Sequence, residues 1–188
     1  LASTSARTLG IFGYGEQAGT HIEALLEVRQ FEHIVVWGRD LERARRFADE
    51  QSARYGIKVM AVADGKLAAG CDVVCTATAA PEPILFADWL QPGQHLNVVG
   101  SSIPTTAEVD ERTIAASRVF VDFKESALAL AGDFRRAKAA GLVGDEHILG
   151  CVGDVLTGRV AARLEPTDIT LFKSLGMASE DLLACDFV

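Results

Sequence analysis

The sequence predicts an α/β fold in which a doubly wound, mostly parallel sheet lies between two layers of helices, as a three-layer αβα sandwich. Short apolar runs of strand length alternate with segments of helical periodicity along the 188 residues, which is the pattern of strand–helix–strand units. A glycine-rich turn joins the first of these strands to the first helix. Hydrophobic residues make up 49% of the chain and aromatic residues only 7%, so the core that one domain of this length can bury is mainly aliphatic.

The first strand and the first helix enclose a turn that is suited to binding phosphate. Residues 8–12 form an apolar run, and residues 13–18 read GYGEQA, a GxGxxA pattern. Gly13 permits the sharp turn, Gly15 lets a pyrophosphate approach the backbone, and Ala18 lets the helix pack close to the strand. The free N–H groups at the helix N-terminus then face the anion. An ordinary glycine-rich turn is the alternative, but the position between strand and helix favours a dinucleotide-binding corner.

The next elements continue the alternation. Residues 33–37 are a second apolar strand, and residues 41–55 form a helix with Asp40 as its N-cap. Apolar residues recur on one side of this helix and arginines on the other, as expected of an amphipathic surface helix. A third strand, a short helix and a fourth strand are expected at 58–62, 64–69 and 72–76.

The second half of the chain shows the same alternation with longer loops. Pro81 and Pro83 punctuate a loop before residues 84–90, and residues 91–94 form a turn. Further strands are expected at 95–99, 118–121 and 169–172. Further helices are expected at 110–117, 126–140, 145–156 and 179–184. Strands that are joined by helices form parallel pairs with right-handed crossovers.

Ligands bind sheets of this kind at the carboxyl ends of the strands. The segments at those ends are 13–17, 38–40, 76–78 and 99–102. Gly38 and Arg39 follow the second strand, where an adenosine ribose is expected, and Arg43 lies one helical turn later. A guanidinium is a fork of donors that suits a 2′-phosphate, whereas Asp40 would accept from a free 2′-hydroxyl if it did not cap the helix. These residues favour NADP as the cofactor, with NAD as the alternative.

Other polar residues lie at strand ends or in apolar surroundings. Thr76, Ala77 and Thr78 either line a ribose or nicotinamide site with two hydroxyls or are a plain strand end. His21 is expected to be a packing residue of the first helix. The residues expected to be structural are His33, His95 and His147. The charged residues that could each orient a loop are Glu125, Asp133 and Lys173.

Composition excludes several classes of function. The formal net charge of −8 disfavours nucleic acid as a partner. No apolar run is long enough to span a bilayer, so we expect no membrane association. The four cysteines form no Cys-x-x-Cys pair and have no histidine at metal-ligand spacing, so we expect no metal site. Cys71 and Cys75 flank an apolar strand as core thiols, which fits a reducing cytoplasm.

Six blocks of the chain together resemble the ornithine cyclodeaminase/mu-crystallin family. They are GIFGYGEQAGTHIEALLEVR, VVWGRDLERARRFA, CDVVCTATAAPEPIL, GQHLNVVGSSIP, VFVDFKESALALAGD and DITLFKSLGMASEDL. The resemblance implies that residues 1–188 are an NAD(P)-binding Rossmann domain and that an N-terminal substrate and dimerisation domain lies outside the chain. The start at Leu1 without an initiator methionine leads us to expect a partial chain. The family arrangement implies that the whole protein is a homodimer.

The resemblance also implies hydride transfer between a nicotinamide and an imine or amino-acid carbon. The family includes ketimine and Δ1-pyrroline-2-carboxylate reductases, amino-acid dehydrogenases and ornithine cyclodeaminases. The cyclodeaminases carry a catalytic Asp in a GDxP-like loop after the fifth strand. Here that loop, residues 100–104, reads GSSIP, so Ser102 stands at the catalytic position. Because a serine cannot act as a carboxylate base at neutral pH, an NADPH-dependent ketimine reductase or amino-acid dehydrogenase is favoured.

Position by position, the resemblance implies a set of cofactor contacts. Contacts to the pyrophosphate and 2′-phosphate are implied for Gly15, Glu16, Gln17, Gly38, Arg39, Asp40 and Arg43. Contacts near the ribose and nicotinamide are implied for Thr76, Thr78 and Ser102, with Leu175 packing at the nicotinamide end. The ligands of the substrate carboxylate are expected outside the chain. Ornithine cyclodeamination and a non-catalytic nucleotide- or ligand-binding module are the alternative functions.

Overall fold

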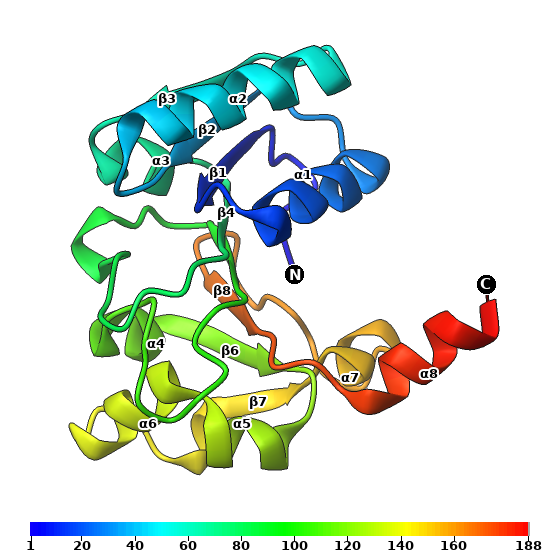
Figure 1. Ribbon diagram of the computed structural model, residues 1–188. Helices are drawn as coiled ribbons and strands as arrows, with labels where there is room; N and C mark the ends of the chain where they lie inside the picture. The colour runs from blue at the N-terminus through cyan, green and yellow to red at the C-terminus, as the bar shows by residue number, and fades with distance from the viewer. Residues whose placement is uncertain (188) are drawn as a thin grey trace.

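The computed structural model describes residues 1–187, and Figure 1 shows their arrangement. Within this range eight strands form one sheet in the order β3-β2-β1-β4-β5-β8-β6-β7, and every neighbouring pair is parallel. The strands are β1 Thr8–Phe12, β2 His33–Trp37, β3 Val59–Val62, β4 Val73–Thr76, β5 His95–Val98, β6 Ser117–Val121, β7 Ile148–Cys151 and β8 Ile169–Lys173. The predicted α/β fold with a parallel sheet is confirmed.

Helices cover both faces of this sheet. They are α1 Glu16–Val28, α2 Leu41–Tyr55, α3 Gly65–Ala69, α4 Glu111–Ala116, α5 Lys124–Leu130, α6 Gly132–Ala139, α7 Val152–Leu156 and α8 Ala178–Phe187, with 3₁₀ turns η1 Ala87–Trp89 and η2 Asp145–His147. On one face, Ile22 of α1 and Phe47 of α2 belong to one buried apolar cluster. On the other face, Ala68 of α3, Ile114 of α4 and Phe134 of α6 belong to a second cluster. The two clusters make the predicted three layers.

The direction of winding reverses at β1. From β1 the chain moves outward through β2 to β3, and it then returns to β4 on the other side of β1 and continues to β5. The turns that leave β1 and β4 therefore diverge toward opposite faces, which creates a crevice at the carboxyl ends of these strands. The crevice is the place where a sheet of this topology binds ligands.

The helix expected at 145–156 is wrong. This segment contains η2, the strand β7 and the short helix α7. Ile148 of β7 is buried and pairs with Val119 of β6, which extends the sheet by one strand. A short apolar run cannot be assigned to helix or strand from periodicity alone, and here the pairing with β6 decides the outcome.

The single helix expected at 126–140 is also wrong, because α5 and α6 meet at Ala131, whose backbone is extended. Gly132 begins α6 in close contact with Thr106, and a Cβ at Gly132 would lie 1.8 Å from the Thr106 carbonyl oxygen. The break brings Asp133 to the backbone of Glu108. A contact between such distant residues leaves no trace in the helical periodicity of the segment.

The other predicted elements lie close to their expected positions, and the final helix is longer than the expected 179–184. Asp40 caps α2 as predicted, because its side chain accepts the backbone N–H of Arg43 at 3.1 Å. Every helix within residues 1–187 falls short of the length and apolar character that a bilayer crossing needs.

Candidate dinucleotide-binding site

The turn between β1 and α1 has the geometry of an anion-binding corner. Gly13 has φ +125°, and a Cβ there would lie 2.6 Å from the carbonyl oxygen of Ala77, so this position requires glycine. Gly15 is the N-cap of α1 and gives it no side-chain cap. No heavy atom lies within 4 Å of the place that a Cβ of Gly15 would occupy. Space is therefore open beside the start of α1, where a phosphate would approach the first N–H groups of the helix.

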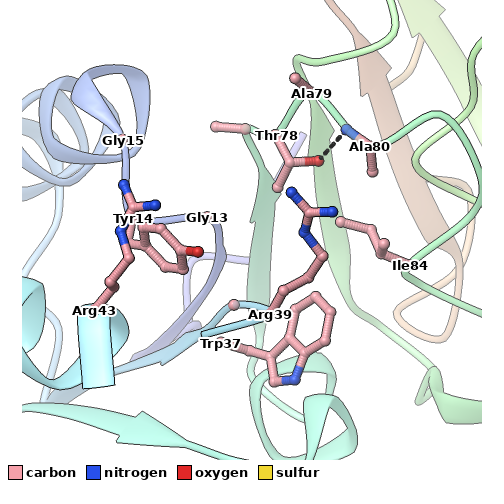
Figure 2. A pocket seen from close by; sticks show the side chains of 12 residues that line it. Gly13, Tyr14, Gly15, Trp37, Arg39, Arg43, Thr78, Ala79, Ala80 and Ile84 are labelled. Carbon is pink, nitrogen blue, oxygen red and sulfur yellow. Dashed lines mark hydrogen bonds between the residues drawn. The ribbon is translucent and has the colours of Figure 1, made fainter. Parts of the chain in front are cut away.

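A cleft of about 230 Å³ opens in front of this corner. Figure 2 shows that its walls come from the turn after β1, the segment from Trp37 into α2, and the segment after β4. The lining residues are Gly13, Tyr14, Gly15, Trp37, Gly38, Arg39, Arg43, Ala77, Thr78, Ala79, Ala80 and Ile84. The cleft therefore lies at the topological switch point that the sheet order creates.

Two arginines stand on opposite sides of the cleft (Figure 2). Arg43 lies against the ring of Tyr14, and Arg39 rises beside Trp37 toward the side of Thr78. Neither arginine forms an ion pair with a carboxylate in the part of the chain that the structure describes. Asp40, next to Arg39 in sequence, caps α2, and Glu42, next to Arg43, pairs with Arg45. The cleft thus presents two cations without carboxylate partners, which suits a phosphorylated ligand.

The residues predicted for the site fall into two groups. Seven of them line the cleft: Gly13, Gly15, Gly38, Arg39, Arg43, Ala77 and Thr78. The other six lie outside this lining: Glu16, Gln17, Asp40, Thr76, Ser102 and Leu175. Glu16 and Gln17 are exposed in the first turn of α1, and Ser102 is exposed in the loop after β5.

Beneath the ends of β4 and β5 lies a buried carboxylate, Glu108, which the sequence reasoning missed. It accepts the hydroxyl of Thr76 at 2.7 Å, the hydroxyl of Thr78 at 2.6 Å, and the backbone N–H groups of Thr78 and Gly100 at 2.7 Å each. Burial raises the pKa of the Glu108 carboxyl, while the hydrogen bonds from Thr78 and Thr76 lower it. The hydroxyls of Thr76 and Thr78 are therefore engaged inside the protein. In the sequence, the position of this glutamate between apolar Ala107 and Val109 is the feature that could have indicated a buried carboxylate.

Glu108 is itself held by a buried ion pair. Asp133 accepts the backbone N–H of Glu108 at 2.6 Å and that of Val109 at 3.0 Å. Its other carboxylate oxygen lies 3.3 Å from the ammonium of Lys173 at the end of β8, close enough for an ion pair although not in hydrogen-bond geometry. Lys173 also donates to the carbonyl oxygen of Gly100. Asp133 and Lys173, expected only as residues that could orient a loop, are both buried and belong to one network.

The loop after β8 is fixed in a similar way. Asp122, at the end of β6, accepts the backbone N–H of Leu175 at 2.5 Å and that of Gly176 at 2.6 Å. It also accepts the N–H of Phe123 at 2.8 Å and is 4% exposed. Asp122 thus determines where Leu175 stands at the carboxyl edge of the sheet.

The histidines contact other parts of the fold. His95 is buried, with Nδ1 2.9 Å from the hydroxyl of Thr170 and Nε2 3.2 Å from the side-chain oxygen of Asn97. Burial lowers the pKa of His95 to about 3, so its ring is neutral. His21 is half-buried and lies 2.7 Å from the carbonyl oxygen of Gln17. Among the side chains that the structure describes, no group of three His, Cys, Asp or Glu could hold a metal ion.

Comparison with known proteins connects this site to a family. Residues 1–188 match the family described as the ornithine cyclodeaminase/mu-crystallin family. The chain is 37% identical to ketimine reductase mu-crystallin of Mus musculus over 188 residues, which is 100% of the chain and 56% of that protein. It therefore spans little more than half the length of this relative.

Two solved structures have the same fold. One is Δ1-pyrroline-2-carboxylate reductase of Thermococcus litoralis in complex with NADH and L-proline, at 33% identity and a TM-score of 0.96 over 99% of this chain and 58% of that one. The other is a probable ornithine cyclodeaminase of Bordetella pertussis Tohama I, at 32% identity and a TM-score of 0.90 over 100% of this chain and 59% of that one.

Proposed function

The chain belongs to the ornithine cyclodeaminase/mu-crystallin family, and we propose that it is the dinucleotide-binding domain of an NADPH-dependent reductase of carboxylate-bearing imines. The observation that carries the proposal is the open N-terminus of α1, which faces a cleft flanked by two arginines without carboxylate partners. Similarity to a ketimine reductase and to a Δ1-pyrroline-2-carboxylate reductase supports a ketimine as the substrate. Oxidation of an amino acid in the reverse direction uses the same site.

The choice of NADPH rests on the segment after β2. Arg39 and Arg43 line the cleft, and Asp40 uses a side-chain oxygen to cap α2. An acidic residue free to accept from a ribose 2′-hydroxyl would favour NADH, whereas a free guanidinium favours the 2′-phosphate. NADH is the alternative cofactor, since the similar reductase of Thermococcus litoralis is a complex with NADH.

In the proposed reaction, the residues of this chain bind and orient the dinucleotide. When bound, the reduced nicotinamide supplies the hydride that reduces the C=N bond. The N–H groups at the start of α1 hold the pyrophosphate, and Arg39 and Arg43 hold the adenosine end. The segments 76–78 and 100–102 lie at the ends of the neighbouring strands β4 and β5 and carry the nicotinamide half. Ser102 is exposed there and stands near the reacting carbon as a hydroxyl that donates or accepts a hydrogen bond.

The remaining parts of the reaction come from outside the chain. We propose that the groups that bind the substrate carboxylate, and the dimer interface, lie in the portion of the relatives that this chain does not cover. The exposed apolar side chains of α8 support this division, since Leu182 is 71%, Leu183 70% and Phe187 93% exposed. Apolar surface of this kind is usually covered by a further domain or a second copy. The described cysteines are all free thiols, which supports a cytoplasmic location.

Ornithine cyclodeamination is the second candidate, because the chain is 32% identical to a probable ornithine cyclodeaminase. Ser102 argues against this function, because a serine hydroxyl cannot act as a carboxylate base at neutral pH. A non-catalytic nucleotide-binding module is the third. These three functions differ in what they consume, so one assay separates them.

The assay uses the protein together with any segments that flank this chain. We expect oxidation of NADPH when Δ1-pyrroline-2-carboxylate or another cyclic ketimine acid is added, with formation of the corresponding cyclic amino acid. Ammonia release from ornithine without net consumption of NADPH would identify a cyclodeaminase. Binding of NADPH without turnover of either substrate would identify a binding module, and both of these results contradict the reductase proposal.

A further inference from the structure

We propose that Glu108, Asp133 and Lys173 are positioning residues that hold the two strand-end segments beneath the nicotinamide half of the dinucleotide. The inference rests on the proposed dinucleotide site and adds a role for residues outside its lining. These side chains are 0%, 0% and 2% exposed, so they act through the backbone that they hold and not by contact with a ligand.

The network holds the backbone of one residue, Gly100, through both its N–H and its C=O group. Glu108 accepts the N–H of Gly100 at 2.7 Å, and Lys173 donates to the carbonyl oxygen of the same residue. Gly100 packs closely against both partners, since a Cβ there would lie 2.3 Å from the carbonyl oxygen of Thr78 and 2.4 Å from the Glu108 carboxyl carbon. The segments after β4 and β5 are therefore locked together as one surface.

Ser101, which follows Gly100, has a backbone conformation that needs support from its surroundings. Ser101 has φ +59°, a left-handed conformation that non-glycine residues seldom adopt. It is 8% exposed, and its hydroxyl has no hydrogen-bond partner within the described chain. A turn with these features persists only when its surroundings hold it. The clamp on Gly100 supplies that support and sets the direction in which the chain continues to Ser102.

The network serves only one half of the cleft. Its hydrogen bonds reach Thr76, Thr78 and Gly100 after β4 and β5, and the structure shows none from it to Arg39 or Arg43 among residues 1–187. A dinucleotide that places its adenosine near β2 and its pyrophosphate at α1 extends its other half toward β4 and β5. Loss of the hydrogen bonds from this network should therefore weaken binding of the nicotinamide half of the dinucleotide and leave binding of the adenosine half unchanged.

The substitution Glu108→Gln tests the clamp with little change in shape. The amide oxygen can still accept two hydrogen bonds, but the NH₂ group faces the backbone N–H of either Gly100 or Thr78, according to how the amide is turned, and cannot accept it. The probes are NADPH and adenosine 2′,5′-bisphosphate, which carries the adenosine and two phosphates without a nicotinamide. We expect the variant to bind NADPH about tenfold more weakly and to bind adenosine 2′,5′-bisphosphate with unchanged affinity. The fluorescence anisotropy of bound NADPH should also fall, because the nicotinamide is held less firmly.

Two further variants separate positioning from general loss of stability. Lys173→Met removes the hydrogen bond to the carbonyl oxygen of Gly100 and should give the same selective loss. Because both residues act through the backbone of Gly100, the double variant should lose less NADPH affinity than the product of the two single losses. Gln94 is the matched control: it is 3% exposed and donates to the carbonyl oxygens of Ala69 and Cys71 at the opposite edge of the sheet. Gln94→Glu should lower the melting temperature and leave both affinities unchanged.

Each other outcome overturns a defined claim. If Glu108→Gln and Lys173→Met bind both probes as the wild type does, or lose both equally while folded, the positioning role is wrong and the dinucleotide site stands. If one of the two variants does not fold, the affinities of the other for the two probes decide whether the positioning role holds. If neither folds while the Gln94 variant does, the positioning role is wrong and the network serves stability alone. A wild-type chain that binds neither probe overturns the proposed function as well.

Discussion

The guanidinium carbon of Arg43 lies 4.9 Å from the ring centroid of Tyr14. This contact joins the turn after β1 to the first turn of α2 at one side of the cleft. The ring in turn rests on Gly38, where a Cβ would lie 2.3 Å from a ring carbon. Gly38 is thus glycine because Tyr14 occupies its side-chain space, and Tyr14 holds one of the two cations in place.

We predict that Tyr14→Ala weakens NADPH binding by about twofold to fivefold, since an exposed cation–π contact contributes roughly 0.5–1 kcal/mol. Tyr14→Phe keeps the ring and should bind as the wild type does. Isothermal titration of both variants gives the affinities. A loss in the phenylalanine variant as large as in the alanine variant would show that the hydroxyl, and not the ring, is the group that matters.

Alanine substitutions at Gly13 and Gly15 should have different effects, one on the free energy of unfolding and the other on dinucleotide affinity. Gly13→Ala places a methyl 2.6 Å from the Ala77 carbonyl oxygen at φ +125°, and we expect it to cost about 1–3 kcal/mol of unfolding free energy. Gly15→Ala meets nothing within 4 Å and should change stability by less than about 0.5 kcal/mol. The same methyl stands where the pyrophosphate approaches, so dinucleotide affinity should fall about tenfold. Urea unfolding and NADPH titration of the two variants test this, and full NADPH affinity in Gly15→Ala would contradict the placement of the pyrophosphate.

His95 gives a prediction about pH. Burial lowers its pKa from 6.5 to about 3, so below pH 6.5 the unfolded chain binds a proton that the folded chain does not. The stability that His95 contributes is complete above its unfolded pKa and is lost as the pH falls toward about 3, at up to about 1.4 kcal/mol per pH unit. Urea unfolding between these pH values should show a shallower pH dependence for His95→Gln than for the wild type. Parallel curves would mean that the ring is protonated in the folded state.

Local patterns were sufficient to predict the frame of the fold and several of the residues that line the cleft. The strand at 8–12, the glycines of the following turn and the cap at Asp40 all depend on near neighbours in sequence, and the structure has them where they were expected. These elements bring Arg39 and Arg43 to the cleft, and the contact with Tyr14 then holds the Arg43 side chain.

The features that sequence did not reveal depend on distant partners. The strand β7 exists because it pairs with β6, and the break at Ala131 accommodates the contact of Gly132 with Thr106. Glu108 receives its hydrogen bonds from residues of two other strand ends. A charged residue in an apolar stretch indicates that a partner exists, but its identity follows only from the order of strands in the sheet.

The most direct test of the account is a fluorescence titration of NADPH and NADH against the wild type and Arg39→Ala, with Arg46→Ala as the control. Arg46 is an exposed arginine of the same segment that does not line the cleft, so its loss removes one positive charge without touching the site. A charge-assisted contact to a 2′-phosphate contributes roughly 1.5–3 kcal/mol, or about one to two decades in affinity. We predict that the wild type prefers NADPH, that Arg39→Ala loses about this much affinity for NADPH and almost none for NADH, and that Arg46→Ala changes neither affinity. A wild-type preference for NADH, or an equal loss of both cofactors in Arg39→Ala, would contradict this prediction.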